Sequence, residues 1–356
     1  IGMRKSDFLQ SLTFSGKNNL DNFFKGDINL ISTDKSIFSN STLIDVRTSD
    51  EFESGNIPGA VNFPIFDNLE RTEIGKIFKN LGKNAAFIKG LDFFVPRIEH
   101  FLSSLTHLRS GHLVVYCARG GMRSASVVKL LKENGFSVSQ MLGGYKEYRK
   151  FVLKELKKKL PPIIVLHGKT GVGKTLLLKN LPNHLDLEGL AQHRSSLFGA
   201  IHKIPNTQKN FEACLVQKLS NVSSNLPLFV EGESRKVGRV FIPQALANAM
   251  KNGVFVLLKA SIKVRIRRII EEYQINDEKS IQQVDSILLL LRESLGKSKI
   301  EKMRWWLKRS EIERIVHMLL LDYYDPRYEN SMKKYKFAIQ ISTEDLDQAS
   351  KELIGF

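Results

Sequence analysis

Residues 168–175 read Gly-Lys-Thr-Gly-Val-Gly-Lys-Thr, which is a complete G-x-x-x-x-G-K-[ST] pattern. The apolar run 163–167 directly before it predicts a buried strand, and residues 176–181 predict a helix after it. A glycine-rich loop in this context points backbone N–H groups at phosphate oxygens, while its lysine and threonine serve the terminal phosphates and Mg²⁺. The residues that we expect to bind phosphate are Gly168, Gly171, Gly173, Lys174 and Thr175.

This P-loop predicts binding of a di- or triphosphate without identifying the nucleotide or other anion. The run 226–230 predicts another buried strand, which ends at Glu231 and Glu233 and is followed by Arg235. An acid at the end of such a strand commonly holds Mg²⁺ in P-loop proteins, but it is usually an Asp. ATP hydrolysis therefore does not follow from the pattern. The alternative is that Glu231 and Glu233 are surface carboxylates that follow an edge strand. The pattern does not identify a bound metal.

A cysteine opens a second glycine-rich loop, Cys117-Ala-Arg-Gly-Gly-Met-Arg, between the predicted strand 112–116 and a helical pattern over 124–133. Converging amides, a helix N-terminus and two arginines all favour an anion, and they also favour the thiolate form of the cysteine. A thiolate that faces an anion pocket suits sulfur or selenium transfer, and it suits attack on a phosphate ester equally well. The residues that we expect to form this anion loop with Cys117 are Arg119, Gly120, Gly121 and Arg123.

Residues 43–47 (Leu-Ile-Asp-Val-Arg) and 51–60, together with the cysteine loop, resemble a rhodanese homology domain. In that family the cysteine carries the transferred sulfur, whereas the segment around Asp45 and Arg47 belongs to the fold's signature and is structural. The loop here departs from the usual pattern, because Cys117 to Arg123 spans seven residues where sulfur-transferring rhodaneses use six. Rhodanese-fold cell-cycle phosphatases use seven, and a larger loop fits phosphate or selenophosphate.

The order of the predicted elements indicates an α/β protein. We expect an N-terminal segment over 1–29, a rhodanese-like parallel-sheet domain over 30–155, and a P-loop NTPase-like domain over 160–356 with a helical, basic extension. Pro161 and Pro162 mark the boundary, after a charged helical tail at 154–159. The other elements that we expect are a helix at 97–108, strands at 137–142 and 254–258, and helices over 262–322.

The charge balance is strongly basic, with 54 Lys and Arg against 37 Asp and Glu and a formal net charge of +17. Such a charge attracts nucleic acid, an anionic membrane surface or phosphorylated metabolites, although a generally basic proteome would produce it too. Two cysteines are too few for a disulfide framework, which favours a reducing cytoplasm. We see no apolar run of about 18 residues and no signal-peptide core, so we expect no membrane association.

Nearly the whole chain resembles the family of bacterial tRNA 2-selenouridine synthases. The motifs that carry the resemblance are at 116–124, 167–175, 186–194, 231–238 and 324–328, and the last three have no general P-loop meaning. The resemblance implies chemistry at the wobble 2-thiouridine of tRNAs for Lys, Glu and Gln. The sulfur would be alkylated from geranyl diphosphate, and selenium from selenophosphate would then displace the geranylthio group. A selenophosphate-producing enzyme would be a partner.

The resemblance also implies roles for individual residues. Geranyl diphosphate would bind the P-loop, and Cys117 would carry or deliver selenium. His193 and Arg194 would bind phosphate or orient an acid–base step, unless the histidine is structural. Unpaired bases are often stacked on aromatic side chains. The candidates for this, which core packing would equally explain, are Trp305, Trp306 and the tyrosines in 323–328.

Two other interpretations remain open from the residues alone. A phosphatase-like rhodanese domain fused to a small-molecule kinase would explain both loops, and the seven-residue spacing favours it. An RNA-binding protein with a degenerate rhodanese module is the third, but such modules typically lose the cysteine that is present here. Cys214 lies in an apolar helical context at 211–215, so we expect it in the core.

Overall fold

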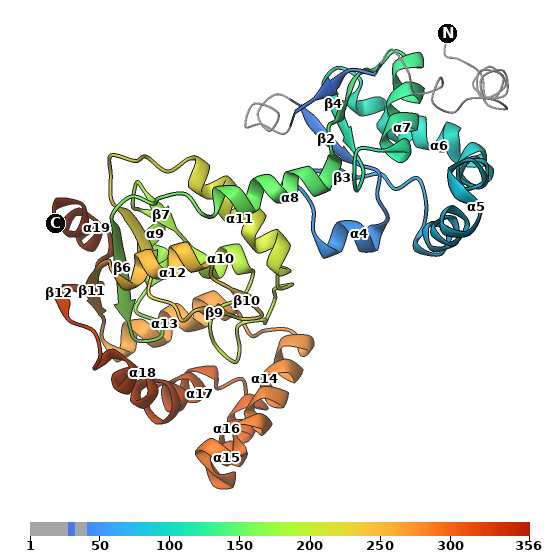
Figure 1. The fold of residues 1–356 in the computed structure, drawn as a ribbon. Coiled ribbons are helices and arrows are strands. Elements are labelled where there is room, and N and C mark those ends of the chain that lie inside the picture. The colour runs from blue at the N-terminus through green and yellow to red at the C-terminus, as the bar shows by residue number, and fades with distance from the viewer. Residues whose placement is uncertain (1–27, 33–40) are drawn as a thin grey trace. The chain divides into compact units, whose positions relative to one another are not determined.

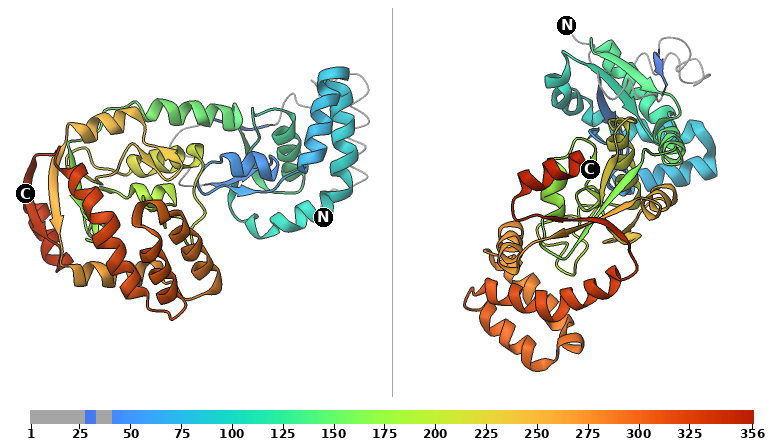
Figure 2. Two further views of the ribbon diagram at one scale, coloured as in Figure 1. Left: turned by 90° about the horizontal axis from the view of Figure 1, so that it is seen from below. Right: turned by 90° about the vertical axis from the view of Figure 1, so that its left-hand side faces the viewer.

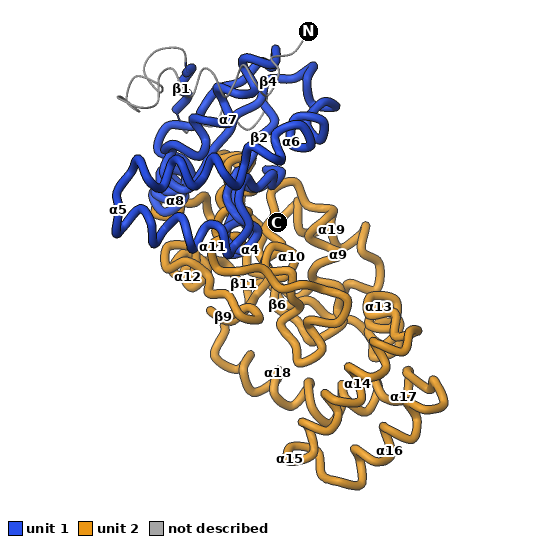
Figure 3. The backbone as a smooth tube through the Cα atoms, turned by 90° about the vertical axis from the view of Figure 1, so that its right-hand side faces the viewer, with its two compact units in different colours: residues 1–155 blue, residues 156–356 orange. Residues whose placement is uncertain are grey.

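The computed structural model describes residues 28–32 and 41–356, so most of the 1–29 segment lies outside the described residues. The chain divides into two compact units, Ile1–Glu155 and Leu156–Phe356 (Figure 3). Each unit is an α/β structure with its own parallel five-stranded sheet (Figure 1). The α/β fold class is thereby confirmed. In the described part of the chain, no helix combines the length and apolarity that crossing a bilayer requires.

The sheet of the first unit has the strand order β1-β5-β4-β2-β3. Its centre is the apolar stretch Leu113–Val115 of β4, whose three side chains are fully buried. The strands are β1 (Leu30–Ile31), β2 (Thr42–Asp45), β3 (Val61–Asn62), β4 (His112–Tyr116) and β5 (Ser137–Met141). The α-helices are α4 (Ser49–Ser54), α5 (Asn68–Phe94), α6 (Ile98–Leu105), α7 (Met122–Glu133) and α8 (Gly144–Glu155).

A buried ion pair fixes the end of β2. Asp45 and Arg47 are almost inaccessible, with Arg47 Nη2 2.6 Å from Asp45 Oδ2 and 2.8 Å from the carbonyl oxygen of Gly55. The guanidinium also lies 4.0 Å from the ring centre of Tyr145 on α8. This pair joins the strand end to α8 and to the turn after α4, so it is structural.

The sheet of the second unit has the order β12-β11-β6-β8-β7, with β6 in the middle. All six residues of β6 are buried, because helices cover both faces of the sheet (Figure 2). The strands are β6 (Ile163–Gly168), β7 (His184–Leu185), β8 (Leu228–Glu231), β11 (Val254–Lys259) and β12 (Phe337–Ser342). A short antiparallel pair, β9 (Lys236–Val237) and β10 (Val240–Phe241), lies outside that sheet.

Helices of the second unit include a group that follows β11 and packs around its own apolar core. Those beside the sheet are α9 (Lys174–Lys179), α10 (Leu187–Ala191), α11 (Gln208–Ser220), α12 (Gln244–Lys251) and α19 (Leu346–Gly355). The later group, orange to red in Figure 1, is α13 (Ile262–Tyr273), α14 (Glu278–Leu290), α15 (Arg292–Leu295), α16 (Lys297–Leu307), α17 (Ile312–Leu319) and α18 (Asp325–Met332).

Several predicted elements differ from the structure. The expected helical tail at 154–159 is only the end of α8, which stops at Glu155 ahead of the two prolines. The expected helix at 97–108 is α6, flanked by 3₁₀ turns at Val95–Arg97 and Thr106–Leu108. Strand β12 was not predicted; it is an edge strand in which exposed side chains alternate with partly or fully buried ones. Helix α5 was not predicted either, and it is kinked at Gly82.

Candidate functional site

The cysteine loop connects the end of β4 to the start of α7. Cys117 is 3% exposed, and its Sγ lies 3.2 Å from the hydroxyl oxygen of Ser124. Gln140 of β5 donates its amide to that hydroxyl at 2.8 Å and to the carbonyl oxygen of Gly120 at 2.9 Å. The thiol is therefore held between the loop and the first turn of α7.

The loop is tightly packed against the start of α8. Backbone N–H groups of Tyr145 and Lys146 donate to the carbonyl oxygens of Cys117 and Ala118 at 2.9 and 3.0 Å. Gly120 has a φ of +63°, and a Cβ there would come within 2.9 Å of backbone atoms of residues 141 and 143. Only glycine fits this position, so the close packing of the loop on α8 depends on it.

The arginines of the loop are placed differently from each other. Arg123 is bound to Glu51 of α4, with nitrogen–oxygen distances of 2.6 and 3.2 Å, and this interaction lowers the pKa of Glu51 despite its burial. Arg119 is exposed. Of the two loop arginines, Arg123 is therefore already engaged in an ion pair, and the role of both in binding an anion stays a prediction.

A third arginine, Arg71 of α5, is a residue that the sequence did not reveal. Its guanidinium interacts electrostatically with Cys117, Glu51 and Arg123, and burial together with the charge of Arg123 lowers the pKa of Arg71. Its Nε is buried without a hydrogen-bond partner among the described residues. Because α5 lies about fifty positions before the cysteine, no local motif signals this contact. A guanidinium with a free N–H that interacts electrostatically with the cysteine suits an incoming oxyanion.

In the second unit, the P-loop connects β6 to α9. Lys174 is half-buried, and its Nζ lies 3.3 Å from the carbonyl oxygen of Gly168 and 3.5 Å from the hydroxyl of Tyr328. Burial lowers the pKa of Lys174, but Tyr328 and the nearby carboxylates outweigh it and raise that pKa above its ordinary value. Gly173 begins α9 with a φ of +90°, which aims the first amides of the helix at the cradle.

Three carboxyl groups gather beside this loop. Glu231 is fully buried, its Oε2 lies 3.4 Å from the hydroxyl of Thr175, and its Oε1 accepts the backbone N–H of Glu188 at 2.7 Å. Burial, reinforced by Glu188 and Glu233, raises the pKa of Glu231 well above its ordinary range. Burial and Glu188 likewise raise the pKa of Glu233 to about 7. The three carboxylates repel one another, and the ammonium of Lys174 partly offsets this repulsion for Glu188 and Glu233.

The motif at 324–328 is joined to the P-loop by an ion-pair network. Asp325 accepts hydrogen bonds from Arg265 at 2.6 and 2.9 Å and from Lys169 at 3.3 Å. Arg265 also donates to the carbonyl oxygen of Thr170 at 2.8 Å. The network holds α18 against the loop, and this places Tyr328 next to Lys174. The sequence contained the motif but did not show this role for it.

The remaining candidate residues of the second unit lie in three different places. Arg194 lines the same cavity as the P-loop glycines, where Glu272 binds it and Tyr273 lies 4.4 Å beneath it. His193 lies beside a neighbouring cavity that also includes Glu233, and burial lowers its pKa. Arg235 is exposed and lines neither of these cavities.

The aromatic candidates and the second cysteine also differ in exposure. Trp306 is 7% exposed and belongs to the core of the helical group, whereas Trp305 is 49% exposed with Arg309 3.7 Å from its ring centre. The guanidinium of Arg327 likewise lies 3.7 Å from the ring centre of Tyr323. Cys214 on α11 is half-buried, and burial raises its pKa.

No set of three or more His, Cys, Asp or Glu side chains in the described ranges is arranged to bind a metal.

Comparison with known proteins matches both units. Residues 161–352 match the model of the tRNA 2-selenouridine synthase AAA domain, and residues 29–151 match the rhodanese-like domain. The tRNA 2-selenouridine synthases of Salmonella paratyphi B and Salmonella schwarzengrund are each 32% identical over 334 residues, which cover 84% of this chain and 91% of theirs. The chain belongs to the tRNA 2-selenouridine synthase family. It is accordingly an enzyme, a transferase.

A solved rhodanese-like domain protein from Staphylococcus aureus is 25% identical, with a TM-score of 0.23 over 34% of this chain and 91% of that one. Membership of the synthase family favours the first of the three interpretations over the phosphatase–kinase fusion. The motifs at 186–194, 231–238 and 324–328 all lie within the region that matches the family model. Of these, the residues beside the P-loop are Glu188, Arg194, Glu231, Glu233, Asp325 and Tyr328.

Proposed function

We propose that this enzyme replaces the sulfur of wobble 2-thiouridine with selenium in the tRNAs for Lys, Glu and Gln, in the cytoplasm. The observation that supports the proposal is that one chain of the synthase family contains a cysteine loop in its first unit and a P-loop in its second unit. Two loops suit two anionic co-substrates. We assign geranyl diphosphate to the P-loop and selenophosphate to the cysteine loop.

The first step makes the sulfur a better leaving group. The thiocarbonyl sulfur attacks C1 of geranyl diphosphate, a carbon–sulfur bond forms, the carbon–oxygen bond breaks and diphosphate leaves. The ammonium of Lys174 and the amides at the start of α9 would stabilise the charge that develops on the diphosphate. The hydroxyl of Thr175 and the carboxylate of Glu231 are oxygen donors of the kind that Mg²⁺ accepts, and they would hold that ion beside the diphosphate.

The second step uses the cysteine loop. The Cys117 thiolate attacks the phosphorus of selenophosphate, so that a sulfur–phosphorus bond forms and the phosphorus–selenium bond breaks. Hydrogen selenide leaves and adds to C2 of the alkylated uridine, and geranylthiol departs as the carbon–sulfur bond breaks. Water then hydrolyses the phosphocysteine to phosphate. Ser124, 3.2 Å from the sulfur, and the nearby Arg71 would position the thiolate and the phosphoryl oxygens. A selenophosphate-producing enzyme would supply the donor.

Mass spectrometry of nucleosides tests this division. Thiolated tRNA would be incubated with geranyl diphosphate, selenophosphate and the wild type, Cys117→Ala or Lys174→Ala. We expect a selenated base with the wild type only, a geranylated base with Cys117→Ala, and at least about a hundredfold less of either product with Lys174→Ala. Cys214→Ala is the matched control and should behave as the wild type. Unmodified tRNA after incubation with the wild type would overturn the proposal.

A further inference from the structure

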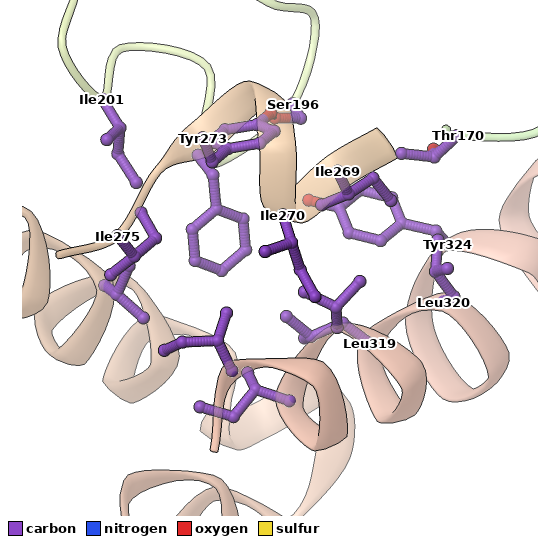
Figure 4. Close-up of a pocket in the computed structure, with 15 residues that line it drawn as sticks. Thr170, Ser196, Ile201, Ile269, Ile270, Tyr273, Ile275, Leu319, Leu320 and Tyr324 are labelled. Atoms are coloured by element: carbon purple, nitrogen blue, oxygen red, sulfur yellow. The ribbon is translucent and has the colours of Figure 1, made fainter. Parts of the chain in front are cut away.

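An apolar cavity lies among the helices that follow β11. Its walls come from α13, α14, α17 and the loop 195–201, and Figure 4 shows Ile201, Ile270, Ile275 and Leu319 directed into the same space. The cavity has a volume of about 70 Å³. That is several times the ~10–15 Å³ that a single water occupies, yet an apolar cavity holds water poorly. The space therefore suits a small hydrocarbon group.

This apolar cavity shares a wall with the phosphate cradle. Thr170, Ser196, Ile269 and Tyr273 line both spaces, and the second space, of about 310 Å³, also contains the P-loop glycines and Lys174. In Figure 4, Thr170 and Ser196 lie along the upper edge of the apolar cavity. A ligand whose charged end rests on the P-loop can thus extend an uncharged end into this space.

The chemistry of the lining excludes a second charged ligand group. Among the described residues, none of those that line the apolar cavity carries a charged side chain. Its few polar groups are hydroxyls, and those of Ser196 and Tyr273 lie 3.0 Å apart. Burial raises the pKa of Tyr273 to about 12, so this hydroxyl stays neutral near pH 7. Binding sites for small molecules are commonly apolar with a few placed polar groups, as here.

The backbone at one wall is irregular in a way that often accompanies function. Residues Leu320–Tyr324 form a π-helical turn between α17 and α18, and Leu320 and Tyr324 both line the cavity. Such turns are uncommon and are frequent at functional sites. The same turn leads into Asp325, which is bound to Lys169 of the P-loop, so one continuous segment contributes to the apolar wall and also contacts the phosphate cradle.

We propose that this cavity binds the hydrocarbon chain of the prenyl diphosphate and selects its length, an inference that rests on the proposed function. The diphosphate lies on the P-loop, and the chain passes Tyr273 and Ser196 to lie against Ile270 and Leu319. The small volume favours a short isoprenoid over a longer one. Burial of the chain supplies binding energy away from the reacting carbon, and contact with the cavity walls holds that carbon at the mouth of the cavity.

Filling the cavity provides the first test. Calorimetry with the full chain would compare inorganic diphosphate with geranyl diphosphate. We expect the wild type to bind geranyl diphosphate at least tenfold more tightly than inorganic diphosphate. Ile270→Phe should reduce that preference to less than threefold while binding inorganic diphosphate as the wild type does. Ile262→Phe, on the same helix but outside the cavity lining, is the matched control and should keep the full preference.

The outcomes separate this inference from the proposed function. If the wild type shows the preference and a folded Ile270→Phe keeps it, the inference falls and the proposed function stands. If the wild type binds geranyl diphosphate no better than inorganic diphosphate, the inference and the geranyl step fall together.

Enlarging the cavity is a second test. It does not require the fold to accommodate the phenylalanine of Ile270→Phe. Ile270→Ala should raise the affinity for farnesyl diphosphate relative to geranyl diphosphate at least threefold. An unchanged ratio would overturn the length selection.

Discussion

At the scale of single residues, Arg71 is the most informative position of the first unit. It is the cation near Cys117 whose Nε lacks a partner in the described part of the chain, whereas Arg123 is bound to Glu51. We expect Arg71→Ala to raise the KM for selenophosphate about tenfold, as befits loss of one charge-assisted contact, and to leave geranylation unchanged. Lys79→Ala, exposed on the same helix, is the control. Equal losses in both variants would rule out a specific role for Arg71.

His167 is a buried histidine whose neutral form the fold requires. It is 5% exposed, its ring lies 4.3 Å from that of Tyr335, and burial lowers its pKa to about 4. The unfolded chain therefore binds the proton more tightly, with a pKa near 6.5. Stability is full above about pH 6.5 and is lost as the pH falls toward 4.

We expect this histidine to contribute about 2 kcal/mol to the difference in unfolding free energy between pH 7 and pH 5. Urea denaturation of the wild type and of His167→Phe at the two pH values measures it. The variant should be less sensitive to pH by about that amount, since its ring cannot take up a proton. Identical pH dependence of the two proteins would contradict the assignment.

At the scale of elements, the contact between α18 and the P-loop depends on one carboxylate. Asp325 is bound by Arg265 and Lys169, and these interactions lower its pKa despite burial. Asp325→Asn leaves the Arg265 guanidinium buried without its counter-charge. We expect a loss of about 3 kcal/mol in unfolding free energy and weaker binding of inorganic diphosphate, because Tyr328 no longer positions Lys174.

Chemical denaturation and calorimetry check this prediction, with Asp322→Asn as the matched control. Asp322 pairs with Lys299 at 2.8 Å on the surface, where such a pair contributes little. The control should therefore stay within about 0.5 kcal/mol of the wild type. If both variants behave alike, the Asp325 network does not hold α18 in place.

At the scale of the whole molecule, the net charge of +17 governs the encounter with tRNA. Release of counterions from neutralised phosphates makes such binding steeply dependent on salt. We expect the Kd for tRNA to rise about a hundredfold between 50 and 200 mM KCl, as for about five phosphate contacts on single-stranded nucleic acid. Filter binding over that range measures it, with Cys117→Ala expected to give the same slope. A flat response would contradict an RNA substrate.

The sequence by itself determined the α/β class and the family, because both depend on contiguous patterns. Strand, glycine-rich loop and helix follow one another within about twenty residues around Lys174 and around Cys117, so local rules suffice to recognise them. The candidate residues named from these motifs stay predictions, although the structure places Glu231 next to Thr175 and Arg194 beside the P-loop. Edge strand β12 was not predicted, since every second side chain is exposed and the strand therefore lacks the continuous apolar run of the buried strands.

Only the tertiary structure decided which distant residues meet. Arg71 reaches the cysteine loop through α5, and Asp325 reaches Lys169 across more than 150 positions. The apolar cavity is the clearest case, because its walls come from residues between 170 and 324. Along the chain, Ile270 and Leu319 have the same spacing as ordinary core residues. Periodicity marks a side chain as buried, but whether it faces another side chain or an open cavity depends on how the helices pack.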